Sequence, residues 1–344
     1  MRYRLILKRL PLVALVGLAL GLALQGKALA QQEPQITSVF KSVVLTDPKD
    51  SGWRNVPSAE LPLTPQVAIK PALSTGTVSS VKVRSVNDGK SIAFLLEWKD
   101  ETRDATASRQ DSFRDAAAIQ FPIGEELPAI CMGVRGQMVN IWHWKADWQE
   151  DIDKGFQDVV DAFPNFYKDT YPGGVSILTG KPPFRMPEDF DTPAAKQFIL
   201  GWSAGNAFSQ PVKTSPIEDL NAIGFSTVTH KAKQNVQGKG AWESGTWRVV
   251  FTRALKVDDV DAAGITPGQQ KPVAVAVWNG SNQEVGARKQ TSTFLTVLVE
   301  AGTGAPAGQN TQTQALILAG VLLVLIAGGA VAYRVFGRSG QRAS

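Results

Sequence analysis

Apolar and polar residues alternate with a period of two through much of the chain between residues 31 and 300. This spacing predicts β-strands that bury one face. The strongest case is the pair of segments 78–86 and 91–98, because the Asn87-Asp88-Gly89 sequence between them favours the tight turn of a β-hairpin. Further segments with this pattern, separated by turn-forming residues, are 116–121, 139–144, 246–251, 273–278 and 291–299.

One region follows a helical spacing instead, with acidic residues between its apolar positions. These apolar positions are Trp148, Ile152, Phe156, Val159, Val160 and Phe163. The YPGG and KPPFRMPEDF segments that follow favour irregular structure, because proline and glycine interrupt regular hydrogen bonding. The sequence therefore predicts a mainly β fold, an antiparallel β-sandwich with a helical or loop-rich insertion at about residues 149–198.

The first 30 residues have the pattern of a secretory signal peptide. A basic start precedes an apolar stretch from Leu10 to Leu24, and Ala28-Leu29-Ala30 matches the small-residue pattern of a cleavage site. The alternative is an uncleaved anchor, which the shortness of the apolar stretch disfavours. Residues 1–30 are therefore expected to direct export and then to be removed.

The other end of the chain predicts a single transmembrane helix. Residues 315–333 form an uninterrupted run of uncharged, mostly apolar side chains, about long enough for a bilayer core of about 30 Å. A buried core helix is the alternative, but three arginines follow the run and none precedes it closely, which favours a basic cytoplasmic tail at 334–344. Residues 301–314 have the composition of a flexible tether. The domain at 31–300 is therefore expected on the periplasmic or extracytoplasmic face of the cell membrane.

The distribution of charge excludes a general nucleic-acid-binding surface. The net charge is +5, but residues 1–30 carry five basic side chains and residues 314–344 carry three, without any acidic one. All 31 acidic side chains lie between these ends, where they outnumber the basic ones. The single cysteine, Cys131, also excludes an internal disulfide and any site built from several cysteines.

The chain lacks the common signatures of hydrolytic catalysis and of phosphate binding. It has two histidines, His143 and His230, and its adjacent acids, such as Asp258-Asp259, are typical of solvated turns. His143 lies between Trp142 and Trp144 on a predicted strand, so the imidazole and the two indoles are expected on opposite faces. For both histidines a structural or surface role is favoured over metal ligation. No catalytic residue is therefore predicted.

Aromatic residues and one methionine provide the candidate chemistry. Nine tryptophans lie in the exported part. Three of them, Trp142, Trp144 and Trp148, follow Met132 within 16 residues. A large flat cofactor needs aromatic and aliphatic walls, together with donors to its metal. Methionine beside tryptophan is also common in hydrophobic cores. Composition leaves these two alternatives open.

Ordered motifs across residues 50–300 resemble a known family. They begin with SGWRNVPSAELPLTPQ and the hairpin VRSVNDGKSIAFLLEWKDETRD, and continue with FRDAAAIQFP, CMGVRGQMVNIWHWKADW, AGNAFS, EDLNAIGFSTVT, VQGKGAWESGTWRVVFTRAL and AVAVWNGSNQEVGARKQTSTFLTVLV. In this order they resemble the haem-b-binding gamma subunit of the type II dimethyl-sulfoxide-reductase family of molybdenum enzymes. Relatives in that family include ethylbenzene dehydrogenase, dimethyl sulfide dehydrogenase, and selenate and chlorate reductases, and nitrite-oxidising complexes have similar subunits.

The resemblance implies a haem b whose iron is held by one methionine and one lysine. The family's methionine corresponds to Met132, and its lysine, just before the last strand, corresponds to Lys289. Met138 and Lys145 are nearby alternatives. Trp142 and Trp144, aromatic residues close to Met132 in the sequence, are predicted to line the cofactor. The long insertion after Asp147 and the carboxyl-terminal anchor depart from the shortest, soluble relatives.

This ligand pair is consistent with electron transfer. Lysine binds a metal only as the neutral amine, although its free pKa is about 10.4. Burial disfavours the ammonium form, and the metal competes with the proton for the same lone pair. A soft thioether favours ferrous iron. With both axial positions taken, no coordination position is open to a substrate. Without the resemblance, Lys289 would be interpreted as an edge-strand lysine that discourages aggregation.

The resemblance implies a non-catalytic electron-transfer subunit of a membrane-associated molybdopterin oxidoreductase complex. Its expected partners are a molybdopterin catalytic subunit, an iron–sulfur subunit and an external carrier such as cytochrome c or the quinone pool. The alternative is an exported, membrane-anchored carbohydrate-binding-like module without haem, because the family's sandwich is similar to carbohydrate-binding modules. Sugar binding would require exposed, coplanar indoles, and a purely structural anchor that has lost the haem site is a third possibility.

Overall fold

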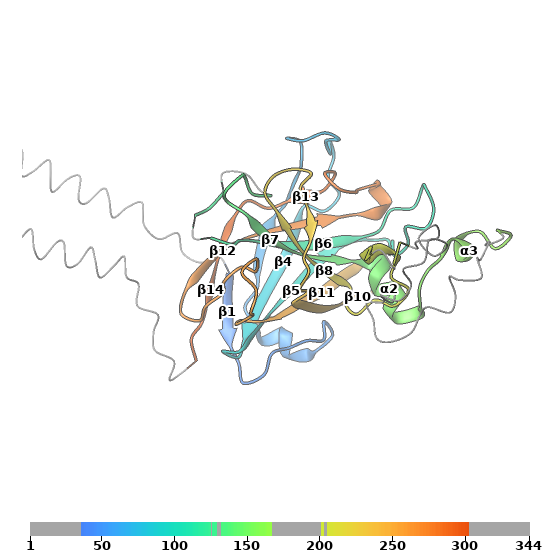
Figure 1. Cartoon of the computed structure of the whole chain (residues 1–344). Coiled ribbons are helices and arrows are strands. Elements are labelled where there is room, and N and C mark those ends of the chain that lie inside the picture. The colour runs from blue at the N-terminus through green and yellow to red at the C-terminus, as the bar shows by residue number, and fades with distance from the viewer. Residues whose placement is uncertain (1–35, 125, 129–131, 167–200, 203–204, 303–344) are drawn as a thin grey trace, which may run out of the picture.

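The computed structural model describes residues 36–166 except 125 and 129–131, together with 201–202 and 205–302 (Figure 1). The predicted signal peptide, the transmembrane segment at 315–333, the basic tail and nearly all of the tether lie outside these residues, as does most of the insertion. Within the described part, no helix has the length and apolarity needed to cross a membrane.

The described chain is mainly β. Its strands are β1 (Ile36–Phe40), β2 (Ala59–Pro62), β3 (Thr64–Pro65), β4 (Ser80–Asn87), β5 (Ser91–Lys99), β6 (Ala116–Pro122), β7 (Val139–Lys145), β8 (Ile217–Ala222), β9 (Thr229–His230), β10 (Val236–Trp242), β11 (Thr246–Ala254), β12 (Gln270–Trp278), β13 (Gln290–Thr291) and β14 (Leu295–Val299). Its helices are α2 (Ala146–Lys154) and α3 (Val159–Ala162), with 3-10 turns η1 (Ser51–Asn55), η3 (Ala207–Ser209) and η4 (Gly280–Asn282).

The strands form one continuous sheet that folds over itself into two layers. The first layer has the order β10-β11-β5-β4-β1-β14, and the second has the order β12-β6-β7-β8-β9. Strand β12 joins the layers, because its residues 270–273 pair with β14 and its residues 274–278 pair with β6. The inner faces meet through aromatic rings, such as Phe94 of β5 and Trp142 of β7 at a centroid distance of 6.0 Å. This arrangement buries one main core between the two layers.

The expectation of a purely antiparallel sheet is wrong at one place. Strand β1 pairs in parallel with both β4 and β14, so the sheet is mixed. The remaining pairs in the described sheet are antiparallel. Strands β4 and β14 run in the same direction with a gap between them, and β1 fills that gap. Local periodicity carries no information about strand direction, so the sequence pattern could not reveal this pairing.

The predicted strands are confirmed, with 291–299 divided into β13 and β14. Strands β8 and β10 were not predicted. Strand β8 (IEDLNA) places charged and amide side chains at buried positions, and β10 (VQGKGAW) contains two glycines. Both features are typical of turns, so they hid the strands from a pattern of apolar alternation.

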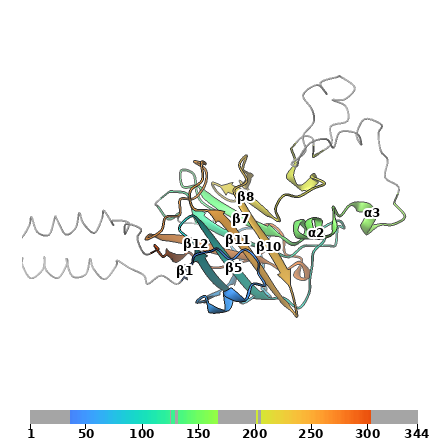
Figure 2. The same cartoon turned by 90° about the horizontal axis from the view of Figure 1, so that it is seen from below.

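The predicted helical spacing at 148–163 is interrupted. Helix α2 ends at Lys154, and the following Gly155 has a φ of 100°, which other residues rarely adopt. The chain then continues to the short helix α3, so one predicted helix is two. Figure 2 shows both helices beyond the ends of β7 and β10.

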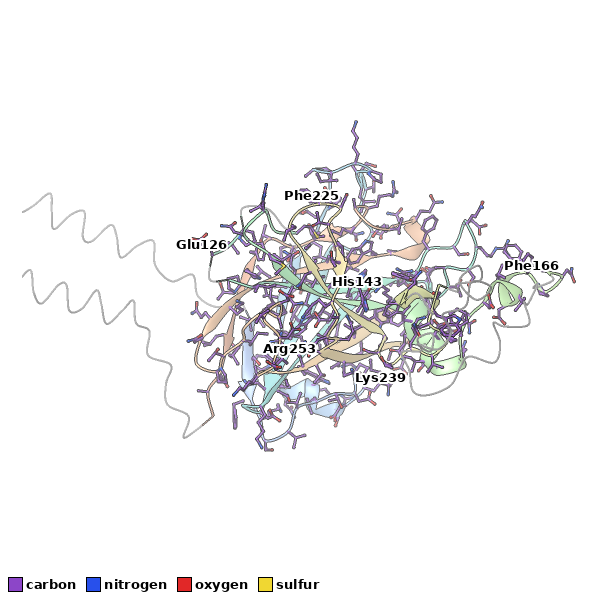
Figure 3. The ribbon with its side chains drawn as sticks, in the orientation of Figure 1. Glu126, His143, Phe166, Phe225, Lys239 and Arg253 are labelled. Atoms are coloured by element: carbon purple, nitrogen blue, oxygen red, sulfur yellow. The ribbon has the colours of Figure 1, made fainter. Side chains whose placement is uncertain are left out.

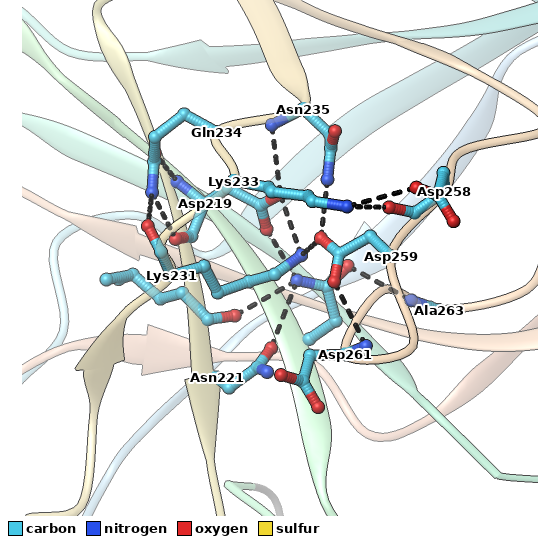
Figure 4. A network of polar contacts seen from close by, with 12 residues as sticks. Asp219, Asn221, Lys231, Lys233, Gln234, Asn235, Asp258, Asp259, Asp261 and Ala263 are labelled. Carbon is cyan, nitrogen blue, oxygen red and sulfur yellow. Dashed lines mark hydrogen bonds and ion pairs between the residues drawn. The ribbon is translucent and has the colours of Figure 1, made fainter.

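A buried polar network explains how β8 tolerates its charges (Figure 4). The Lys231 ammonium contacts the carboxylates of Asp219 at 3.0 Å and Asp259 at 2.9 Å. The Asn140 amide on β7 donates to Asp219 at 2.6 Å. Buried charges are stable only when they are paired and hydrogen-bonded. The network therefore ties β8 both to β7 and to the loop at 258–263.

Glycine is required in β10 by the packing of the core. A Cβ added to Gly240 would lie 2.3 Å from a ring carbon of Trp144, whose side chain is completely buried. We expect Gly240→Ala to lower the free energy of unfolding by about 1–3 kcal/mol, because the buried Trp144 indole has no room to move away from the added methyl group. Urea denaturation measures this change. Gly264→Ala is the control, since its Cβ would meet nothing within 4 Å; equal stability of the two variants would contradict the prediction.

Two buried carboxyl groups, Asp100 and Asp115, make stability depend on pH. Asp115 accepts hydrogen bonds from the Trp247 indole at 2.9 Å and from the Gly280 amide at 2.8 Å. Burial raises the pKa of Asp115 to about 7 and that of Asp100 to about 6. The Asp100 charge raises the pKa of Asp115 further, and the Asp104 charge raises that of Asp100. The folded protein therefore keeps protons that the unfolded chain releases near pH 4. The stability that the two protonated carboxyl groups contribute is lost as the pH rises from about 4 to 7.

In Asp100→Asn, the free energy of unfolding should fall less with rising pH, because the amide stays neutral and does not repel the Asp115 carboxylate. We expect the stability of the variant relative to wild type to rise by on the order of 1–3 kcal/mol between pH 4 and pH 8. Denaturation at a series of pH values measures this difference. Asp111→Asn, at an exposed carboxylate, is the control. A pH-independent difference for Asp100→Asn would contradict the prediction.

Candidate cofactor-binding site

A cavity of about 750 Å³ lies on the outer face of the second layer, over β6, β7, β8 and β12. Small and aliphatic side chains of these strands form its floor, among them Ala118, Ile141, Leu220 and Ala276. Loops at 66–71, 205–208, 225–228 and 285–289 form its walls. Cavities of this size hold drug-sized ligands and cofactors. Figure 3 shows His143 over the middle of the sheet and Phe225 on one of the loops that enclose it.

Met132 and Lys289, which lie 157 residues apart in the sequence, meet in this cavity. The Nζ atom of Lys289 is 3.7 Å from the Sδ atom of Met132. The same Nζ atom lies 5.1 Å from the ring centroid of Trp278. The fold therefore presents a thioether and an amine side by side in a largely apolar cavity.

The backbone holds Met132 in an uncommon conformation. Its φ is 85°, its amide donates to the Gln120 side chain at 3.1 Å, and its carbonyl accepts from the Gly224 amide at 2.9 Å. The next residue, Gly133, has a φ of 75°, and a Cβ there would lie 2.6 Å from the carbonyl oxygen of Gln137. Only glycine fits this position. This is the physical reason for the Met-Gly sequence.

The turn that precedes β13 positions Lys289. Its carbonyl accepts a hydrogen bond from the Gln66 amide at 2.9 Å. One turn of chain earlier, the Gly286 carbonyl accepts from the Trp278 indole at 3.0 Å. Because Trp278 ends β12, the indole links this turn to the floor of the cavity.

The structure does not place Trp142 and Trp144 at the cavity, which corrects the expectation that they line a cofactor. Both indoles are completely buried on the opposite face of β7, in the main core. The Trp142 ring packs on Phe121 at 4.7 Å, and the Trp144 ring packs on Trp247 at 4.8 Å. Successive residues of a strand point to opposite faces. The residues of β7 that line the cavity are therefore Ile141, His143 and Lys145.

The two alternative ligands, Met138 and Lys145, are less favourably placed. Met138 is not among the residues that line the cavity. Lys145 does line it, but its ammonium is 2.5 Å from a Glu218 carboxylate oxygen. Within the described residues, Met132 and Lys289 are a methionine and a lysine that meet in the cavity.

His143 contacts the site, although a structural or surface role was expected. Its ring stacks on Trp278 at a centroid distance of 4.8 Å. Its Nε2 atom is buried and has no hydrogen-bond partner among the described residues. Burial, with the nearby charges of Lys145 and Arg114, lowers the pKa of His143 well below its usual value, so the ring is neutral. The alternation of side chains along β7 already indicated that His143 lies on the opposite face from Trp142 and Trp144.

Charged groups gather at one end of the cavity. Glu218 on β8 contacts Lys145 at 2.5 Å and the Nδ1 atom of His230 at 2.7 Å. Burial would raise the pKa of Glu218, but the His230 hydrogen bond and the Lys145 charge lower it below its usual value. Burial also lowers the pKa of Lys145 to about 8. Arg114 at this end pairs with Asp147 at 2.9 Å.

The donors and the cavity fit an iron porphyrin. The Lys289 amine and the Met132 thioether lie 3.7 Å apart, so both donor atoms face the same space. In the described part of the chain, no cluster of three or more histidine, cysteine or carboxylate side chains could hold a bare metal ion. A methionine thioether is among the donors that proteins offer to haem iron.

The fold and this site define a class of protein: a two-layered β-protein with a large cavity in which a methionine and a lysine meet. Residues 50–290 match the family model of ethylbenzene dehydrogenase. The chain belongs to this family, and the relationship predicted from the order of its motifs is confirmed.

Three relatives extend this result. A candidate heme subunit of a respiratory nitrate reductase, ORF7 of Haloferax mediterranei, is 25% identical over 83% of this chain and 82% of its own length. The chlorate reductase gamma subunit of Ideonella dechloratans is 24% identical over 83% of this chain and 93% of its own. The dimethylsulfide dehydrogenase gamma subunit of Rhodovulum sulfidophilum is 29% identical over 29% of this chain and 40% of its own.

Among solved structures, similarity is found to a family 9 carbohydrate-binding module of Caldicellulosiruptor kristjanssonii in complex with cellotriose. The TM-score is 0.37 at 10% identity, over 80% of this chain and 98% of that one. The likeness is too distant to support an inference about binding.

Proposed function

We propose that this chain is the haem-b-binding, electron-transfer subunit of a molybdopterin oxidoreductase complex. The observation that carries the proposal is the contact between Met132 and Lys289 inside the cavity. The relatives named as a heme subunit and as gamma subunits of chlorate reductase and dimethylsulfide dehydrogenase support it. When bound, haem supplies one-electron redox chemistry.

The protein's own residues would bind the haem and exclude competing reactions. Met132 and Lys289 would hold the iron, which would leave no coordination position for a substrate. Apolar side chains that line the cavity, such as Ile141 and Leu220, would exclude water from the bound group. Lys289 coordinates only without its proton, and the turn anchored by Trp278 keeps its amine near Met132. These roles suit electron transfer rather than catalysis.

The proposed partners follow from the names of the relatives. A gamma subunit belongs to a multisubunit enzyme, so we propose a molybdopterin catalytic subunit and an iron–sulfur subunit as partners. The chain would pass electrons between the iron–sulfur subunit and an external carrier, either cytochrome c or the quinone pool. The catalytic chemistry of the complex would lie in the partner subunit.

The alternative of a sugar-binding module lacks a binding platform in the structure. All nine tryptophans lie in the described part of the chain, and none of them is exposed. Stacking on a sugar ring would need exposed indoles. No observation in the described residues therefore favours this alternative over haem binding.

Absorption spectroscopy tests the proposal. We expect the full chain, expressed with haem supply, to show the Soret and α bands of a b-type haem. Met132→Ala and Lys289→Ala should lose the haem or change its low-spin spectrum, because each removes one axial ligand. Met138→Ala and Lys82→Ala, which lie outside the cavity, are the controls. Absence of haem in the wild type, or spectra unchanged in both ligand variants, would contradict the proposal.

We also propose that the domain at 31–300 is exported and anchored by residues 315–333. The signal-like segment at 1–30, and the arginines after the apolar run, support this orientation. In a bacterial host, alkaline phosphatase fused after residue 300 should be active, because its disulfides form only after export. A fusion after residue 344 should be inactive. The reverse pattern, or activity at neither position, would contradict export and anchoring.

A further inference from the structure

The cavity changes in character along strand β7. Ile141 lies at its apolar end, where the neighbouring Gln120 holds the Met132 backbone. His143 and then Lys145 follow on the same face. Since a strand rises about 3.3 Å per residue, Ile141 and Lys145 are about 13 Å apart along it. The cavity is therefore amphipathic, with the Met132 backbone contact beside Ile141 at one end and charged groups at the other.

The positive charge at the polar end is incompletely compensated. The Lys145 side chain is 1% exposed, yet among the described residues Glu218 supplies the one hydrogen bond to its ammonium. That carboxylate is shared with His230. An ammonium has three N–H groups to satisfy, and its other close contact is the face of the Trp148 ring at 3.9 Å. Burial lowers the pKa of Lys145 to about 8, although the Glu218 carboxylate acts in the opposite direction.

A second, independent observation lies between the two ends. The buried Nε2 atom of His143 has no partner among the described residues. A buried polar atom left without a hydrogen bond costs about 1–3 kcal/mol. Unsatisfied groups of this kind in a native cavity indicate a missing partner. The strip from His143 to Lys145 therefore offers hydrogen-bonding capacity that the described protein does not use.

We propose that the end of the cavity formed by Lys145, Arg114 and His230 is a carboxylate-binding subsite. It takes the acidic edge of an amphipathic planar ligand whose metal lies at Met132 and Lys289. This inference rests on the proposed function, in which the ligand is haem and the carboxylates are its two propionates. A carboxylate there would add a charge-assisted hydrogen bond to Lys145.

Haem and its dimethyl ester, in which both propionates are esterified, distinguish the subsite from the rest of the cavity. The full chain, purified in detergent without haem, is titrated with each compound and followed by absorbance. We expect wild type to bind haem roughly ten- to hundredfold more tightly than the ester, since a hydrogen bond to a charged group has about this value. Equal affinities, with the spectrum of both axial ligands intact, would overturn the subsite and leave the proposed function standing.

Lys145→Gln tests the residue itself. The variant should lose most of the preference for haem over the ester. Lys231→Gln is the matched control, because Lys231 is similarly buried and paired with carboxylates but does not line the cavity. If Lys145→Gln keeps the wild-type preference, the inference is wrong.

A replacement variant and the wild-type measurement cover the case in which Lys145→Gln does not fold. Should Lys145→Gln fail to fold, Arg114→Gln replaces it, and it is expected to reduce the preference in the same way. The wild-type comparison of haem with its ester needs no variant at all. If wild type binds neither compound, both the proposed function and the subsite are wrong, which separates that result from failure of the subsite alone.

Discussion

The contact between Met132 and Lys289 depends on the backbone at Met132-Gly133. Both residues adopt positive φ angles, and Gly133 is packed against the Gln137 and Ala222 carbonyl oxygens, where no side chain fits. This local constraint turns the thioether into the cavity, 3.7 Å from the lysine amine. The cavity itself exists because the floor of the outer face is built largely from alanine and small aliphatic side chains.

Strand β7 explains how one layer supports both a core and a cofactor cavity. Its even-numbered residues, Trp142 and Trp144, fill the space between the layers, and its odd-numbered residues face the cavity. Both faces are enclosed, so polar groups on the outer face are held in a low-dielectric environment. Lys145 and Glu218 form a close pair there, and His143 remains neutral. The packing of Trp142 and Trp144 on one face of β7 thus fixes the positions of His143 and Lys145 on the other face.

Much of the candidate site was predictable from the sequence through family resemblance rather than through pattern alone. Composition could not decide whether Met132 fills a core or binds a metal, and spacing would have assigned Lys289 to an edge strand. The order of motifs named both residues, and the fold brings them together. The prediction for Trp142 and Trp144 failed, because aromatic residues near a ligand in sequence were taken as near it in space. The alternation around His143 already separated the two faces, but it did not show which face holds the cavity.

The amino-acid sequence by itself determined the local features of the chain: the apolar alternation of the predicted strands, the hairpin at Asn87-Asp88-Gly89, and the apolar segments at both ends. These features follow from side-chain periodicity and turn chemistry, which act over a few residues. The parallel pairing of β1, the burial of the charged strand β8 and the encounter of two ligands 157 residues apart were decided only by tertiary structure. Each depends on which distant segments share a surface, and the local order of residues does not encode that directly.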